Sequence, residues 1–199
     1  MGRRFGLGAA AAAAAVCATV AGVSSPSAVA AENSVAGMPG TMTAEKYNAV
    51  NFGMTVAQVI NAIGSDSCDG FSPNFAATPT SYTCWGSEPS GDIYAYANLT
   101  FTQGKLTNKS QESLIKPVAP SMTLAKYNGI TKGMTVNQAM AIANRDSCVI
   151  WSEGYPAYPS TAGHKLNFHC KSGNVPLAYA RFGFIDGVLD WKNHAGGLK

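Results

Sequence analysis

The chain is poor in charge, in histidine and in the motifs that enzymes use. Asp, Glu, Lys and Arg make up only 13% of its 199 residues, about half the usual share in a soluble domain. Its three histidines lack metal-binding spacing, and there is no G-x-S-x-G or H-E-x-x-H motif. A net charge of +3 gives no indication of nucleic-acid binding, which needs a strong basic patch. These absences predict a protein that is not an enzyme and holds no cofactor or metal.

Long hydrophobic runs are also missing, except at the N-terminus. There, Arg3 and Arg4 precede an Ala-rich apolar segment at 6–23, which ends in the small-x-small pattern Ala28-Val29-Ala30. This order is typical of a cleaved export signal. We predict that residues 1–30 are a signal peptide, that the protein is secreted, and that the mature chain does not insert into a membrane.

Four cysteines follow the predicted signal, and an even number in an exported protein favours two disulfide bonds. Three pairings are possible for these four residues. They are Cys68, Cys84, Cys148 and Cys170.

An internal repeat organises the chain. Thr43–Cys68 and Thr123–Cys148 share 12 of 26 residues at a constant offset of 80, and Ala95–Leu106 resembles Ala178–Leu189. We predict a tandem duplication, with a first unit at 31–106, a partly helical linker at 107–122 and a second unit at 123–199. If each unit closes on itself, Cys68 pairs with Cys84 and Cys148 with Cys170.

Each unit predicts two helices followed by strands. Thr55 with Gln58, and Thr135 with Gln138, fit a capping box at a helix start. Later residues alternate with period two, which is typical of a half-buried antiparallel strand. The fold class is therefore α+β: two helix-helix-four-strand units that form one long curved sheet with helices on one face.

The sheet face without helices carries aromatic residues. Tyr94 and Tyr96 occupy it in the first unit and Tyr179 in the second, and Trp151 and Tyr155 lie in or near the long loops. Tyr, Trp and Arg are enriched where proteins bind other proteins. We therefore expect a monomer that binds a macromolecular partner through this surface.

Four segments resemble the secreted β-lactamase inhibitory proteins (the BLIP family) over nearly all of residues 42–192. They are Asn51-Phe52-Gly53-Met54-Thr55, Gly91-Asp92-Ile93-Tyr94-Ala95-Tyr96-Ala97, Lys109-Ser110-Gln111-Glu112 and the stretch from Trp151 to Gly163. The resemblance implies an eight-stranded sheet whose concave face clamps a protruding loop–helix of a class A β-lactamase. It also implies that the Gly91-Asp92 turn enters the active site, where the carboxylate of Asp92 stands in for that of the substrate.

The resemblance and the aromatic pattern together predict ten partner-binding residues. These are Gly91, Asp92, Ile93, Tyr94, Tyr96, Glu112, Trp151, Tyr155, Tyr179 and Arg181.

The chain departs from the family at several contact positions. Ser113 replaces a contact lysine, Gly183 and Ala195 replace tryptophans, Ile93 replaces a tyrosine, and Arg181 replaces a histidine. The first alternative is therefore a protein on the same scaffold that inhibits weakly or not at all and binds another exported or cell-wall protein, such as a penicillin-binding protein. A second alternative, an envelope lipoprotein, would require lipid on Cys17.

Overall fold

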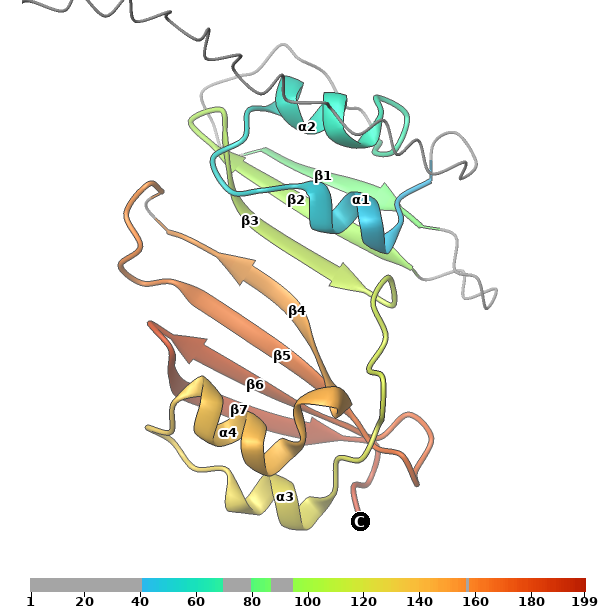
Figure 1. The fold of residues 1–199 in the computed structure, drawn as a ribbon, viewed down its shortest axis with the longest axis vertical. Helices are drawn as coiled ribbons and strands as arrows, with labels where there is room; N and C mark the ends of the chain where they lie inside the picture. The colour runs from blue at the N-terminus through green and yellow to red at the C-terminus, as the bar shows by residue number, and fades with distance from the viewer. Residues whose placement is uncertain (1–40, 70–79, 87–94, 157) are drawn as a thin grey trace, which may run out of the picture. The chain divides into compact units, whose positions relative to one another are not determined.

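The computed structural model describes residues 41–69, 80–86, 95–156 and 158–199 (Figure 1). The predicted signal peptide, residues 1–30, lies outside the described residues. Within the described ranges, no helix is long and apolar enough to cross a membrane.

The described residues form four short α-helices, one 3-10 helix and seven strands. In chain order they are α1 (Ala44–Ala49), α2 (Val56–Ile63), β1 (Thr80–Trp85), β2 (Tyr96–Thr102), β3 (Lys105–Glu112), α3 (Leu124–Gly129), α4 (Val136–Ala143), η1 (Arg145–Ser147), β4 (Cys148–Gly154), β5 (Lys165–Lys171), β6 (Tyr179–Ile185) and β7 (Val188–Ala195).

The two predicted capping boxes are confirmed. At α2 the Thr55 hydroxyl accepts from the backbone N–H of Gln58 at 3.2 Å, and the Gln58 side chain accepts from the Thr55 N–H at 2.9 Å. Thr135 and Gln138 form the same pair at α4. Helices of this length are marginal on their own, so satisfied N-terminal N–H groups matter to them.

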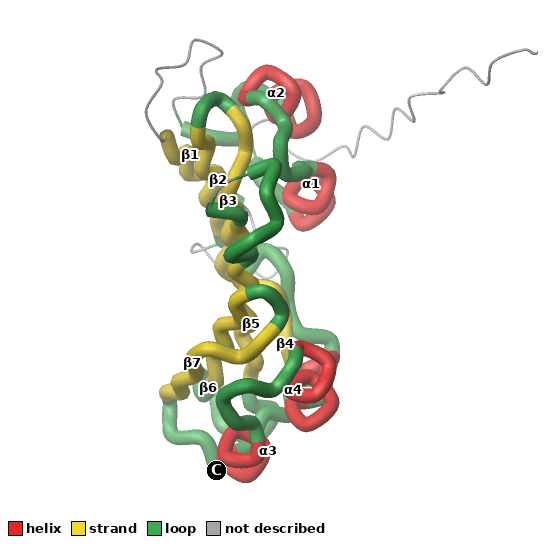
Figure 2. Tube along the Cα trace, turned by 90° about the vertical axis from the view of Figure 1, so that its left-hand side faces the viewer, coloured by secondary structure: helices red, strands yellow, loops and turns green. Residues whose placement is uncertain are grey.

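All seven strands lie in one antiparallel sheet in the order β1-β2-β3-β4-β5-β6-β7. The helices lie to one side of the strands (Figure 2). This agrees with the predicted α+β class with helices on one face. The prediction of four strands in each unit differs from the described residues, in which three strands follow α1 and α2 and four follow α3 and α4. The tandem duplication stays a prediction.

Each helix pair covers its own core. Val56, Val59 and Ile63 of α2 pack against buried residues of β2, while α3 and α4 pack against Phe182 and Phe184 of β6. The buried residues in β2 alternate with partly exposed ones, because successive side chains of a strand point to opposite faces. The core therefore fills the helix-bearing face, and no helix of the described residues covers the other face of the sheet.

Both cores contain a disulfide bond, Cys68–Cys84 in the first and Cys148–Cys170 in the second. These are the pairs expected if each unit closes on itself. Their loops of 16 and 22 residues are each worth about 3 kcal/mol in the chain-entropy account. Such support matters where small cores bury little apolar surface.

The predicted linker at 107–122 is wrong in its first part. Residues 107–112 belong to β3, which crosses the predicted boundary at 106/107, and residues 113–122 contain no helix. The physical reason is pairing on both edges: β3 pairs with β2 along its length and with β4 at residues 108–110. These ladders satisfy backbone groups that a helix would otherwise have to satisfy.

The sheet is continuous across the β3–β4 junction through only three residue pairs, Asn108 with Gly154, Lys109 with Glu153 and Ser110 with Ser152. Just beyond them Gln111, only 2% exposed, replaces the missing ladder. Its amide donates to the carbonyl of Ile150 at 3.0 Å and its Oε1 accepts from the N–H groups of Leu114 and Ile115, both at 3.1 Å. We call this junction, the three pairs with Gln111, the seam.

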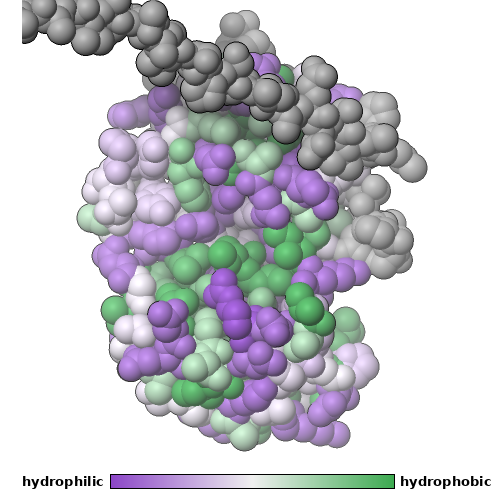
Figure 3. Space-filling view, in the orientation of Figure 1, coloured by the Kyte–Doolittle hydropathy of each residue, from purple (hydrophilic) through white to green (hydrophobic). Residues whose placement is uncertain are grey.

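On the helix-bearing face, hydrophobic surface gathers between the two helix pairs (Figure 3). A pocket of about 330 Å³ opens there, and its lining includes Tyr47, Ile115 and Ile150. Charged residues, among them Lys109 and Glu153, also line this pocket. Gln111 itself is buried beside it, and a buried polar group that is left unpaired is costly.

We predict that Gln111→Leu lowers the free energy of unfolding by about 2 kcal/mol or more, because one carbonyl and two N–H groups lose their partner. Ser110→Ala, next to it on the opposite face, is the matched control and should change the free energy by less than about 0.5 kcal/mol. Urea unfolding monitored by circular dichroism measures both. Equal stability of the two variants would contradict the role assigned to Gln111.

Candidate partner-binding surface

The sheet face opposite the helices carries a continuous set of aromatic and charged side chains, which we call the open face. Residues on this face alternate along each strand with core residues, as Tyr96 does with Ala97 and Arg181 does with Ala180 and Phe182. The members used below are Trp85, Tyr96, Glu112, Trp151, His169, Tyr179, Arg181 and Trp191.

Strand register brings three of these residues into line in the first half of the sheet. Trp85 of β1 lies opposite Tyr96 of β2, and Tyr96 lies opposite Glu112 of β3. The Trp85 and Tyr96 ring centroids are 5.8 Å apart, and the Trp85 side chain is 51% exposed. Trp85 is held in place because its Nε1 donates to the Asp69 carboxylate at 2.7 Å.

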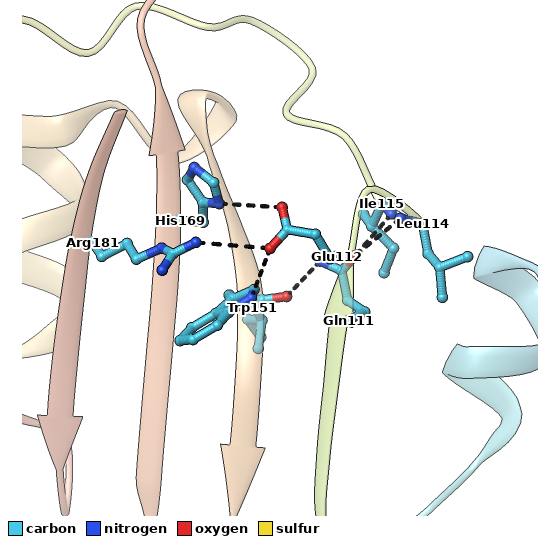
Figure 4. Close-up of polar contacts among 8 residues, drawn as sticks. Gln111, Glu112, Leu114, Ile115, Trp151, His169 and Arg181 are labelled. Carbon is cyan, nitrogen blue, oxygen red and sulfur yellow. Dashed lines mark hydrogen bonds and ion pairs between the residues drawn. The ribbon is translucent and has the colours of Figure 1, made fainter. Parts of the chain in front are cut away.

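Glu112 connects this row to the second half. The register of β4 against β5 shifts between Ile150 and Ser152, which leaves Trp151 as the extra residue of a bulge. Trp151 Nε1 donates to Glu112 Oε2 at 3.1 Å, and the Arg181 guanidinium lies 3.7 Å from the same oxygen (Figure 4). Four of the predicted residues, Tyr96, Glu112, Trp151 and Arg181, thus lie on one face of the sheet, on β2, β3, β4 and β6.

Arg181 is held between aromatic rings. Its guanidinium carbon lies 4.3 Å from the Trp151 ring centroid and 4.9 Å from that of Tyr179. Cation–π contacts of this kind are worth about 0.5–2 kcal/mol each. The predicted residue Tyr179 thereby joins the same cluster.

His169 of β5 lies on the open face but is only 7% exposed. Burial first, and then the positive charges of Arg181 and Lys171, lower the pKa of His169 from 6.5 to about 4. The imidazole is therefore neutral at pH 7. Its Nδ1 lies 3.9 Å from Glu112 Oε1, so that approach is a neutral contact and not an ion pair.

Trp191 belongs to the open face and was missed from the sequence. It lies opposite Gly183 in the β6–β7 register, and its indole covers that glycine so closely that a Cβ added at Gly183 would overlap Nε1. Glycine in a strand often marks such a close approach. The sequence did contain a signal for this close approach. It is Gly183 itself, which occupies one of the positions where the family resemblance implies a tryptophan.

Tyr155 does not join the cluster. It follows β4 and stacks on His164 at 4.3 Å between centroids, and its edge contacts Phe52 at 4.8 Å. Its part in binding stays a prediction. Gly91, Asp92, Ile93 and Tyr94 lie outside the described residues.

The described residues offer no group of three or more His, Cys, Asp or Glu side chains that could hold a metal ion. What the open face offers instead is hydrogen-bond donors, one partly shielded carboxylate and large aromatic area. These are the groups that stabilise protein–protein contacts.

Comparison with known proteins gives a match over well over half of the chain. The sequence model of a family described as Beta-lactamase inhibitor (BLIP) matches residues 43–170. This range runs from the N-cap of α1 into β5, so it includes both disulfides and the seam. Among solved structures, a Streptococcus mutans protein described as a candidate β-lactamase inhibitor protein is similar with a TM-score of 0.44 and 13% identity, over 78% of this chain and 90% of that chain.

We predict that His169 makes stability fall in mild acid. Between pH 6.5 and 4 the unfolded chain binds a proton that the folded imidazole does not take up, so the free energy of unfolding decreases as the pH falls through this window. The decrease is up to about 3 kcal/mol. His169→Gln should remove this part of the pH dependence, as measured by urea unfolding at pH 7 and pH 4.

The exposed residue His194 provides the matched control for this experiment. His194→Gln should keep the wild-type pH dependence. A His169→Gln variant that loses as much stability as wild type between the two pH values would overturn the assignment.

Proposed function

The chain belongs to the β-lactamase inhibitor (BLIP) family, and from this premise we propose that it is a secreted protein that binds class A β-lactamases through its open face and inhibits them. In this proposal it has no catalytic activity. The observation that carries the proposal is the open face itself, where aromatic and charged residues from β1 to β7 lie uncovered by helices.

The composition of the open face supports binding to a protein. Trp85 and Trp191 are 51% and 38% exposed, large values for side chains of this size. Aromatic residues bury much area on binding and lose little conformational entropy, so they dominate the energy of many interfaces. The cluster of Trp151 and Arg181 around Glu112 is already ordered in the free protein, which lowers the ordering cost of association.

The proposed inhibitory step uses Asp92. The support for it is the sequence: the Gly91-Asp92 segment resembles the family's inserted turn, and it precedes Tyr96, the first residue of β2 on the open face. A carboxylate presented there could accept charge-assisted hydrogen bonds from a site built for the carboxylate of a β-lactam. Such bonds are about twice as strong as neutral ones.

A second candidate function is binding of another exported protein, such as a penicillin-binding transpeptidase, with weak or no inhibition of β-lactamases. The observation that favours it is the altered content of the open face. Trp191 covers Gly183 where the family resemblance implies a tryptophan, and Arg181 occupies a histidine position beside Glu112. Replaced hot-spot residues can each cost about 2 kcal/mol or more in affinity.

We expect purified residues 31–199, with both disulfides formed, to inhibit at least one class A β-lactamase at micromolar concentration or below. Initial rates of hydrolysis of a chromogenic cephalosporin by a panel of class A enzymes measure this. Trp151→Ala should weaken the inhibition, because it removes both the indole area and the donor to Glu112. Absence of inhibition across the panel, together with binding to a penicillin-binding transpeptidase, would favour the second candidate.

We expect Asp92→Ala to raise the inhibition constant at least about tenfold, which corresponds to about 1.4 kcal/mol. The matched control is Asp66→Ala, which removes an exposed carboxylate near the end of α2 and should leave inhibition unchanged. Equal effects of the two substitutions would show that Asp92 does not enter the active site.

A further inference from the structure

We propose that a pocket on the open face binds the carboxylate of an acidic side chain of the partner protein. The pocket measures about 410 Å³, and His169, Lys171, Leu177, Tyr179 and Arg181 contribute to its lining. The proposal rests on one part of the proposed function, namely that the open face is the surface that binds a protein. It adds the chemistry of the group that this surface selects.

The pocket holds two cations whose hydrogen-bonding capacity is unused. Within the described part of the chain, neither the Lys171 ammonium nor the Arg181 guanidinium donates a side-chain hydrogen bond to a protein atom, and the buried Nε of Arg181 has no partner. The nearest acid, Glu112, lies 3.7 Å from Arg181, which is beyond hydrogen-bond distance. A guanidinium and an ammonium in this state favour an anion, and a carboxylate matches the planar fork of arginine.

Glu112 positions Arg181 and does not neutralise the pocket. One of its oxygens, Oε2, already accepts from Trp151 Nε1 at 3.1 Å. Its single negative charge faces two positive charges, those of Lys171 and Arg181. The aromatic contacts of Arg181 with Trp151 and Tyr179 fix the guanidinium plane before a partner arrives, so less freedom is lost on binding.

The lowered pKa of His169 is consistent with a positive electrostatic potential in the pocket. After burial, Arg181 and Lys171 are the causes of its lowered pKa, so their charges are felt at the imidazole. Its Nε2 is buried without a hydrogen-bond partner, and its ring contacts Tyr179 edge to face at 4.6 Å. A neutral ring in this position forms a wall of the pocket without adding a third cation.

The rim of the pocket indicates that the carboxylate arrives on a protein. Leu177 is 92% exposed and has a positive φ of 64°, a conformation that is rare for a branched residue. Its isobutyl group and the Tyr179 ring flank the two cations. A free ion would gain nothing from this apolar rim, whereas an acidic side chain with apolar neighbours would bury it.

The experiment compares Lys171→Glu with Lys165→Glu. Both lysines are on β5 at positions of the same parity, and Lys165 is exposed and lies outside the pocket. Against the most strongly inhibited class A β-lactamase, Lys171→Glu should weaken inhibition at least about tenfold more than Lys165→Glu. Reversing the charge of the partner's docked acidic residue to lysine should restore inhibition by Lys171→Glu. Equal effects of the two substitutions would overturn the proposal.

A second measurement separates this proposal from the proposed function. The Arg181 Nε–H signal of the ¹⁵N-labelled protein is titrated with N-acetyl-glutamate N-methylamide, with the glutamine analogue and with sodium acetate. We expect a saturable shift with the glutamate compound alone, even if no β-lactamase is inhibited. No shift, or an equal shift with the glutamine analogue, would overturn the proposal, and equal binding of acetate would assign the pocket to free carboxylates instead.

Discussion

The open face depends on the seam between β3 and β4. Three residue pairs and the Gln111 side chain join a three-stranded and a four-stranded sheet into one. The β3–β4 ladder is the shortest in the sheet, and the Trp151–Glu112 hydrogen bond and the Tyr155–Phe52 contact add to it across the same junction. A buried amide that satisfies one carbonyl and two N–H groups is well suited to this position, because any of them left unpaired would be costly.

The same strand end also builds the candidate site. Gln111 points to the helix-bearing side of β3 and Glu112 to the open face, since successive side chains alternate. Glu112 is therefore the residue of the first half that meets Trp151 and Arg181 of the second (Figure 4). The end of β3 therefore both joins the two halves of the sheet and positions the charged cluster. The affinity of a partner that binds across the open face would depend on both.

Much of the fold could be predicted from local pattern. The capping residues mark both main helices, the period-two segments mark β2 and β6, and the repeat selects the disulfide pairs found in the structure. The features that could not be predicted depend on pairing between segments that are distant in the sequence. Residues 107–112 have no strong strand pattern of their own and become a strand because β2 and β4 pair with them. The burial of His169 and the position of Trp191 over Gly183 likewise follow from register, which local sequence does not fix.

Under the proposed function, the departures from the family resemblance redistribute the groups that the open face offers to a partner. Aromatic area absent at Gly183 is supplied from the neighbouring strand by Trp191, and positive charge absent at Ser113 is present instead at Arg181 and Lys171. Aromatic surface that is supplied by an adjacent strand can still be buried against a protein partner. A positive charge at a different position, in contrast, contacts a different acidic group of the partner. Because complementary charges select partners more than they add affinity, target preference on this scaffold should follow the positions of Lys171 and Arg181 and not family membership alone.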